Sequence, residues 1–392
     1  MKRIVFVIGN MGIGGAQKSL IQALRNIDYS LYDVTLYVRR NKTELLSEVP
    51  SGVRVIVNKS ASNISHGLVS RLYEIPKRVC KKIGLRLVAK KIADAQNCYY
   101  IKTQYSYEEQ VLQTNEEYDI AISYMNGDTC RFVRDRIKAN NYILFYLASV
   151  DAVPEIHRSY LPLYDSIVTD STESKQVLLR NYPGLSEKIT TINNYIDWSD
   201  IHKKAQEVLD FDRGNGYVFV SCGRLVDVKG HDLAIQAAQR LKEKKISFKW
   251  LFVGDGPRRK ELEEMIISYG LQQEVIIIGM KKNPYPWIMA CDIYVQPSYE
   301  ESYGLTITEA AVLNKTIVAT NTAGAREQLV NNETGIIVDI NDRALADGIM
   351  NLINNSELKG KIENNLKNRD WDAAQSEYRK KIGCLLEHQE QS

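Results

Sequence analysis

The chain has 392 residues, of which 44% are hydrophobic and 25% charged, with a formal net charge of +3. This length and apolar content exclude a disordered protein and predict two domains, each with its own core. The six cysteines lack Cys-x-x-Cys spacing, no apolar run reaches the roughly 20 residues of a membrane-spanning helix, and no signal-peptide pattern follows Met1. We therefore expect neither a zinc ribbon nor a disulfide framework, and we expect a cytoplasmic protein.

Short apolar, β-branched runs alternate with amphipathic stretches along the first half of the chain. The expected strands are residues 3–9, 33–38, 53–57, 119–123, 141–147 and 166–170, and a helix over 16–24 follows the first of them. This alternation is typical of parallel strands joined by crossover helices.

The same alternation restarts at Tyr217. Strands are expected at 217–223, 249–254, 275–279, 293–298, 315–320 and 335–339, with helices at 231–244 and 258–270 and a last helix after Trp371. We therefore predict an α/β protein with two doubly wound parallel-sheet domains, residues 1–197 and 198–371, and a terminal helix over 372–392.

The stretch IVFVIGNMGIGGAQKSL, residues 4–20, is a strand that runs through a glycine-rich turn into a helix. A dinucleotide fingerprint that starts at Gly12 fails at its third glycine, and the second strand ends in Arg39 and Arg40 instead of an acid. A close backbone approach at Gly14 and Gly15 remains, with a helix N-terminus that favours an anion. A tight turn without a ligand is the alternative.

The stretch GRLVDVKGHDLAI places two cations, Arg224 and Lys229, on the loop between a strand and a helix. A forked guanidinium and an ammonium at the carboxyl end of a strand can hold a diphosphate together. The alternative is a solvated loop with two ordinary cations.

The stretch QPSYEESYGLTITEAAVL carries Glu301 in a loop and Glu309 inside the helix that begins near Leu305. Were all eight intervening steps helical, the carboxylates would lie ~12 Å apart. Carboxylate pairs of glycoside hydrolases are closer, at ~5 to 9.5 Å. We therefore expect the two acids to hold the sugar and the ribose of one elongated ligand, with the helix N-terminus at its phosphates. Two surface charges are the alternative.

Four motifs in this order, SCGRLVDVKG, LFVGDGP, VIIIGMKKN and PSYEESYGLTITEA, resemble the retaining GT-B glycosyltransferases of family four, the glycosyl transferases group 1. Glu301 and Glu309 satisfy the Glu-x7-Glu spacing of that family. The resemblance covers most of the chain and is strongest over 217–340. It implies two Rossmann-like domains that face each other across a cleft, a terminal helix that returns to the first domain, and a hinge at 193–200 and 365–372.

The resemblance also implies roles for residues around the nucleotide. Arg224 and Lys229 would bind the diphosphate and act in catalysis, with help from the backbone N–H groups of Leu305 and Thr306. Glu309 would accept hydrogen bonds from the ribose.

The remaining implied roles concern the base, the sugar and the first domain. The main chain of Met280 would face the base, and Gly15, with Gly14, would close over the β-phosphate. Glu301 would hold the transferred sugar and act in catalysis, together with the backbone of Ser302, Tyr303 and Gly304.

The reaction implied by the resemblance moves a sugar from a nucleoside diphosphate, UDP above all, to a hydroxyl of a saccharide or lipid-linked acceptor, with retained configuration. The leaving phosphate would take the acceptor's proton, so no side-chain nucleophile and no cofactor is expected. No Asp-x-Asp cluster stands where a metal would bind, and a metal-independent reaction is expected. The alternatives are a soluble sugar-phosphate or sucrose-type synthase and a non-catalytic nucleotide-sugar-binding protein.

The chain departs from the family at one place. Many relatives carry a histidine after the strand that corresponds to 141–147, where this sequence has Ala148 and Ser149. Asp151 and His157 are nearby but out of register, so the donor sugar and the acceptor-side residues stay open.

Residues 71–91 contain eight Lys or Arg and one Glu, interleaved with apolar residues. Such a face is attracted to anionic lipid headgroups. We expect it to dock the first domain on the inner leaflet near a lipid-linked acceptor, with a solvated basic helix face as the alternative. No aromatic platform accompanies the charges, so nucleic acid is not expected.

Overall fold

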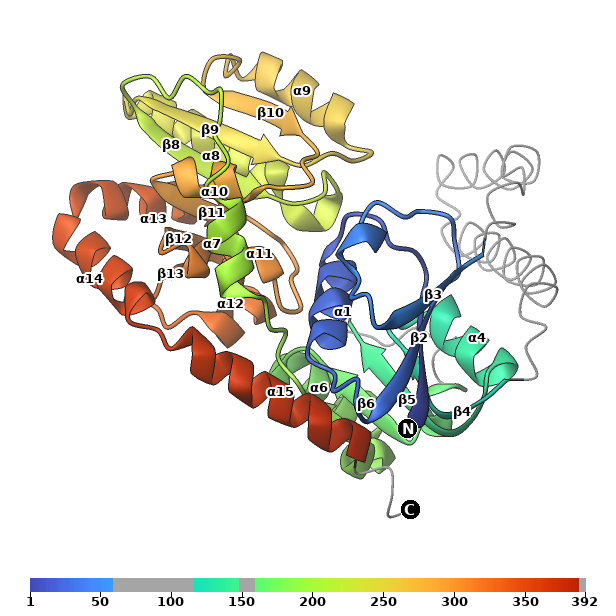
Figure 1. The fold of residues 1–392 in the computed structure, drawn as a ribbon. Coiled ribbons are helices and arrows are strands. Elements are labelled where there is room, and N and C mark those ends of the chain that lie inside the picture. Colours follow the sequence, from blue (N-terminus) through green and yellow to red (C-terminus); the bar gives the residue numbers. More distant parts are fainter. Residues whose placement is uncertain (59–115, 148–158, 388–392) are drawn as a thin grey trace, which may run out of the picture.

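A computed structural model describes residues 1–58, 116–147 and 159–387 and shows two parallel sheets with helices packed on them (Figure 1). The predicted α/β class with two doubly wound domains is confirmed. The expected strands are present, and a short strand that the sequence pattern missed extends the first sheet.

The first sheet has seven strands in the order β3-β2-β1-β4-β5-β6-β7, all parallel. The chain order reverses between β1 and β4, and in open parallel sheets ligands bind outside the strand carboxyl ends at such a reversal. The strands are β1 (Lys2–Ile8), β2 (Tyr32–Val38), β3 (Val53–Val57), β4 (Glu117–Ser123), β5 (Lys138–Tyr146), β6 (Ser166–Thr169) and β7 (Ile189–Thr191). The described helices around it are α1 (Gly15–Arg25), α4 (Asp128–Arg136) and α6 (Thr172–Asn181), with short 3₁₀ helices η1 (Leu46–Glu48), η3 (Leu161–Leu163) and η4 (Pro183–Lys188).

The second sheet has six parallel strands in the order β10-β9-β8-β11-β12-β13. They are β8 (Tyr217–Cys222), β9 (Phe248–Val253), β10 (Val275–Gly279), β11 (Ile293–Gln296), β12 (Thr316–Thr320) and β13 (Ile336–Val338). The helices are α7 (Trp198–Lys204), α8 (His231–Glu243), α9 (Arg259–Ser268), α10 (Tyr285–Ala290), α11 (Leu305–Val312), α12 (Ala323–Gln328), α13 (Asp342–Asn354) and α14 (Ser356–Lys367), with η5 (Asp227–Lys229) before α8.

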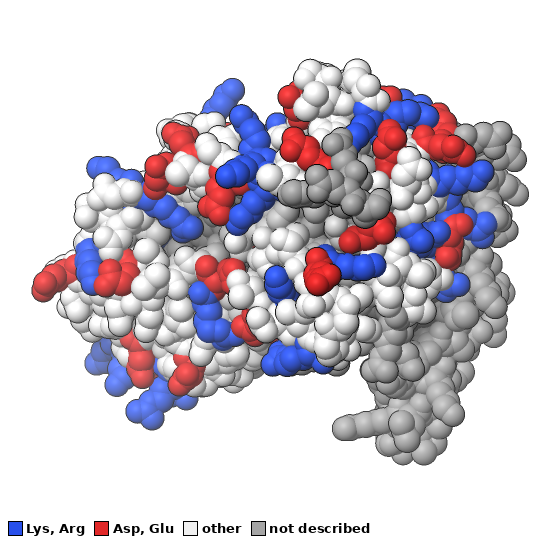
Figure 2. Space-filling view, turned by 90° about the horizontal axis from the view of Figure 1, so that it is seen from below, with Lys and Arg blue, Asp and Glu red and all other residues white. Residues whose placement is uncertain are grey.

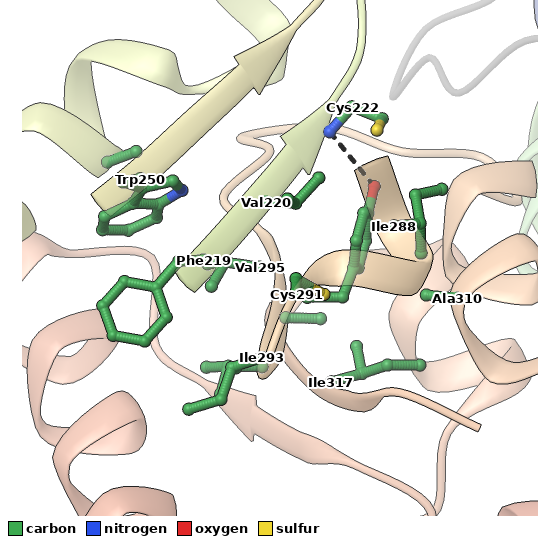
Figure 3. Close-up of a cluster of buried hydrophobic side chains, with 14 of the residues drawn as sticks. Phe219, Val220, Cys222, Trp250, Ile288, Cys291, Ile293, Val295, Ala310 and Ile317 are labelled. Carbon is green, nitrogen blue, oxygen red and sulfur yellow. Dashed lines mark hydrogen bonds between the residues drawn. The ribbon is translucent and has the colours of Figure 1, made fainter. Parts of the chain in front are cut away.

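The core of the second domain lies where its strands meet these helices (Figure 3). Val220 of β8 and Ile317 of β12 lie on the face of the sheet that Ile288 of α10 and Ala310 of α11 cover, whereas Ile293 of β11 pairs with Phe219 and lies on the opposite face. Strands covered on both faces read as nearly continuous apolar runs, which explains why the sequence pattern located them well.

The terminal helix α15 (Trp371–Glu387) runs from the second domain to the first (Figure 1). Trp371 packs against the core of the second domain, and Asp372 accepts a hydrogen bond from Trp198 Nε1 at 2.9 Å. Farther along the helix, Tyr378, Ile382, Leu385 and Leu386 are buried in the core of the first domain. The last segment of the chain therefore packs on both domains.

Several residues that the sequence singled out lie outside the described residues. These are the basic segment 71–91 and the positions Ala148, Ser149, Asp151 and His157. Within the described ranges, no helix combines the length and the apolar composition needed to cross a membrane. On the face seen in Figure 2, Lys and Arg side chains are interspersed with Asp and Glu.

Candidate functional site

Helices α1 and α11, which belong to different domains, begin beside each other. A Cβ atom added to Gly15, the first residue of α1, would lie 3.6 Å from Leu305 Cδ1 at the start of α11. Farther along these helices, Lys18 Nζ lies 2.5 Å from Glu309 Oε1. Because each helix N-terminus carries partial positive charge, their meeting favours an anion between the domains.

The first turn of α11 offers free backbone donors. Gly304 caps the helix in the left-handed region at φ 80°, and no side chain in the described part of the chain caps it. The N–H groups of Leu305 and Thr306 have no acceptor among the residues that the structure describes. The preceding loop is fixed because Gln328 Nε2 donates to the carbonyls of Tyr303 and Gly304. The donors are therefore held in place for a ligand.

Glu301 and Lys229 form an ion pair beside this turn, with 2.5 Å between Lys229 Nζ and Glu301 Oε2. The same oxygen accepts from Ser298 Oγ at 3.2 Å and from Gln296 Nε2 at 3.4 Å. The two side chains are only 20% and 11% exposed. The structure thus brings together two residues that the sequence assigned to the diphosphate and to the sugar.

The loop that carries Lys229 packs closely against the end of β11, and a glycine makes this close packing possible. Gly230 has φ 63°, and a Cβ atom there would lie 2.0 Å from the carbonyl oxygen of Pro297. Only glycine fits this position, which sets Lys229 over the loop of Glu301. Arg224, two residues after the end of β8, is exposed and makes no ion pair or side-chain hydrogen bond within the described ranges. Its guanidinium is therefore available for an anionic ligand.

Glu309 is fully buried and is not a surface residue of its helix. Its Oε1 atom accepts from Lys18 Nζ at 2.5 Å and from Tyr285 Oη at 3.2 Å. Burial alone would lower the pKa of Lys18, but Glu309 and Tyr285 together outweigh it and raise that pKa above its ordinary value. Glu309 Oε2 is buried and has no hydrogen-bond partner among the described residues.

Three further predicted residues, Met280, Gly14 and Ser302, have other surroundings. Met280 follows β10 directly and is 51% exposed. Gly14 caps α1 in an extended conformation, with Gln17 of its own helix as its near neighbour. Ser302 reaches across to the first domain, where its Oγ donates to Asp170 Oδ2 at 3.1 Å.

Asp170 is a residue that the sequence analysis missed. It directly follows β6, it is 4% exposed, and it also accepts from Ser174 Oγ at 3.4 Å. Burial raises the pKa of its carboxyl to about 7. Its place at the carboxyl end of a parallel strand was the signal that could have identified it, because ligands bind at that edge. In the structure, Asp170 therefore lies on the first domain, where it faces Glu301 and Ser302 of the second domain.

Residues 205–369 match the family described as glycosyl transferases group 1. A curated relative, the N-acetylgalactosamine-N,N'-diacetylbacillosaminyl-diphospho-undecaprenol 4-alpha-N-acetylgalactosaminyltransferase of Campylobacter jejuni, is 28% identical over 53% of this chain and 56% of its own length. The capsular polysaccharide biosynthesis glycosyltransferase CapM of Staphylococcus aureus is 26% identical over 60% of this chain and 62% of its own length. The matched stretch spans 42% to 62% of the first three curated relatives.

Solved structures match over nearly the whole chain. Anabaena HepE in complex with UDP-glucose has a TM-score of 0.69 at 20% identity and covers 99% of this chain and 100% of its own. Sucrose-phosphate synthase from Thermosynechococcus elongatus has a TM-score of 0.70 at 15% identity, with 99% of each chain covered. The match to the glycosyl transferases group 1 family thus covers residues 205–369, and the likeness to solved structures shows that the two Rossmann-like domains have the GT-B fold.

Proposed function

We propose that the protein transfers a sugar from a nucleoside-diphosphate sugar, UDP-sugar above all, to a hydroxyl of a saccharide or lipid-linked acceptor. We further propose retention of configuration, independence of metal ions, and a role in the assembly of a surface polysaccharide or related glycan. One observation carries the proposal, namely that an anion site and a buried acid lie close together. The anion site, at one edge of the second sheet, consists of Arg224, Lys229 and the free N–H groups of α11. The buried acid is Glu309, which also belongs to α11.

Known proteins support the choice of substrates. The Campylobacter jejuni relative is named for a diphospho-undecaprenol-linked acceptor, and CapM for capsular polysaccharide biosynthesis. HepE is described in complexes with UDP and with UDP-glucose. A lipid-linked or polymeric acceptor at a membrane surface also suits the basic segment 71–91, which we propose as a docking surface.

The chemistry we propose needs no side-chain nucleophile. As the bond between the sugar and the diphosphate breaks, negative charge grows on the diphosphate oxygens. Fixed cations and N–H dipoles stabilise that charge more in the transition state than in the ground state. The acceptor oxygen bonds to the anomeric carbon on the face that the diphosphate leaves, and its proton passes to a leaving phosphate oxygen.

A thermal-shift panel with UDP-, GDP- and ADP-sugars tests the donor class. A ligand present at 100 times its dissociation constant stabilises the folded protein by ~2.7 kcal/mol, so one base should give a clear shift. Release of nucleoside diphosphate with and without candidate acceptors then separates an enzyme from a binding protein.

The double variant Arg224→Ala, Lys229→Ala tests the diphosphate site. We expect its kcat to fall by at least about 100-fold, since removal of even one charge-stabilising donor has effects of that order. Arg343→Ala is the matched control, because that side chain is 80% exposed on α13. Full turnover in the double variant contradicts the proposed site, and loss of activity in EDTA contradicts metal independence.

A further inference from the structure

The two oxygens of the buried Glu309 carboxylate have different surroundings. Oε1 is held by Lys18 Nζ at 2.5 Å and by Tyr285 Oη at 3.2 Å, and these two groups lie 3.2 Å from each other. Oε2 is equally buried but has no hydrogen-bond partner among the residues that the structure describes. A buried acceptor without a donor is costly, so Oε2 is set up for a donor that a ligand supplies.

We propose that Lys18 and Tyr285 are positioning residues for the nucleotide ribose: they anchor Oε1 of Glu309, so that Oε2 is the oxygen that receives a ribose hydroxyl. This inference rests on the proposed function and deepens it. Neither residue belongs to the glycine turn or to the Glu-x7-Glu element, so the motifs alone do not identify them.

The charge of Lys18 matters as much as its geometry. A carboxylate removed from water is strongly disfavoured without a cation or several donors around it. In the structure, Lys18 is the only cation that forms an ion pair with Glu309 within the described part of the chain, and its ammonium also lies 4.9 Å from the centre of the Tyr285 ring. The ammonium thus keeps a charged acceptor available inside the protein, and a hydroxyl can complete its hydrogen bonding.

The anchor joins the two domains. Lys18 lies on α1 of the first domain, whereas Tyr285 and Glu309 lie on α10 and α11 of the second. A pocket beside them is lined from both sides by residues that include Lys18, Glu48, Tyr285 and Lys282. Glu309 therefore has its ribose-ready arrangement only while the domains are in contact, and ribose recognition depends on a residue outside the nucleotide-binding domain.

A competing interpretation predicts the opposite change in nucleotide affinity when Lys18 is removed. If Lys18 occupied the place of the ligand, a nucleotide would have to displace it, and removal of Lys18 would strengthen nucleotide binding. In our proposal Lys18 holds the oxygen that the ligand does not use, so its removal weakens binding, and only through the ribose.

The experiment titrates the 392-residue chain with UDP, GDP and ADP and with the 2'-deoxy and 3'-deoxy forms of each. For the base that binds, we expect the ribonucleotide to bind about tenfold more tightly than one of its deoxy forms, the value of one hydrogen bond to a charged acceptor. In Lys18→Met that ratio should fall to about two or less, because the ribonucleotide is weakened while the deoxy form is not. Lys18→Arg, which keeps the cation, should restore most of the ratio.

Two further variants provide a second test and a control. Tyr285→Phe removes one hydrogen bond to Oε1 and keeps the ion pair, so an intermediate ratio of about three is expected even if Lys18→Met folds poorly. Lys260→Met is the matched control, because its side chain is 89% exposed on α9. An unchanged ratio in Lys18→Met and Tyr285→Phe, or tighter binding in Lys18→Met, overturns the inference. Absence of binding by every nucleotide to the unaltered protein overturns the proposed function instead, and the inference falls with it.

Discussion

His231 begins α8 two residues after Lys229, and its ring is buried inside the second domain. It is 2% exposed, and its ring lies edge-on to Phe252 with 5.0 Å between the ring centres. Neither ring nitrogen has a hydrogen-bond partner among the described residues. Burial, with smaller contributions from Lys229 and Arg258, lowers the pKa of His231 to about 3. The folded protein therefore holds this imidazole neutral.

This burial predicts a loss of stability in acid. The unfolded chain has an ordinary histidine with a pKa near 6.5, so between about pH 6.5 and 3 it binds a proton that the folded state does not. The free energy of unfolding should fall as the pH drops through that window, by on the order of 2 kcal/mol between pH 7 and pH 4.5. The free energy of unfolding of His231→Leu, measured in urea at both pH values, should lack this fall.

His202→Gln is the control for that measurement, since His202 lies on α7 and packs edge-on against Trp198. Because other groups also titrate, the test is the difference between variant and parent at the two pH values. If the free energy of unfolding has the same pH dependence in the parent and in His231→Leu, protonation of the buried ring is not coupled to unfolding.

Gly230 shows how one residue fixes the geometry of an element. It combines φ 63° with a Cβ position 2.0 Å from the Pro297 carbonyl oxygen, whereas Gly270 has φ 66° and nothing within 4 Å. We expect Gly270→Ala to cost ~1 kcal/mol of stability for its backbone conformation alone. Gly230→Ala should cost ~1 to 3 kcal/mol more, because η5 must move away from β11.

Gly230→Ala should also weaken nucleoside-diphosphate binding, because the displaced loop carries Lys229 away from Glu301. Chemical denaturation measures the stability difference between the two glycine variants, and nucleotide titration measures the binding difference. If the two variants lose equal stability, or if Gly230→Ala binds nucleotide normally, the loop is not fixed by this contact.

At the scale of elements, the sequence predicted most of the fold, because strands covered on both faces are marked by continuous apolar runs. It missed β7, which has only three residues and so gives little pattern. The helix start near Leu305 was predicted, and α11 begins at that residue.

The site was predictable only in part. Glycine, cation and acid motifs in sequence locate Arg224, Lys229, Glu301 and Glu309, and the structure places the last three in ion pairs. Lys18 was not singled out because its partner lies 291 residues away in the other domain. Asp170 ends a predicted strand, but its contact with Ser302 spans 132 residues and gives no local sign that this strand end faces the site. Contacts between domains leave no local pattern in the chain.

The whole molecule is held together by contacts across the cleft and by α15. Besides the Lys18 and Ser302 contacts, Glu327 of α12 accepts from Asn193 Nδ2 at 2.8 Å and from Thr172 Oγ1 at 3.1 Å, and Arg326 pairs with Glu173. Closure of such a cleft excludes water and completes the set of groups around a substrate. The described contacts indicate that the domains meet in this structure.

Helix α15 is the element whose removal tests this arrangement. A chain that ends at Asp370 keeps Arg224, Lys229, Glu301 and Glu309 but loses four side chains buried in the first domain, Tyr378, Ile382, Leu385 and Leu386. Each such side chain is worth ~1.5 to 3 kcal/mol when fully buried, so the first domain should be strongly destabilised. The Tyr195 ring, which stacks on Tyr378 with 5.6 Å between centres, would be uncovered.

We expect the chain that ends at Asp370 to lose most turnover and to show an earlier thermal transition. A chain that ends at Glu387 is the control, because it keeps α15 entire and should match the parent in both measurements. Lys18 reaches Glu309 from the first domain, so a destabilised first domain should also reduce the preference for ribonucleotides over deoxynucleotides. A fully active chain that ends at Asp370 means that neither the first-domain core nor the interdomain geometry depends on α15.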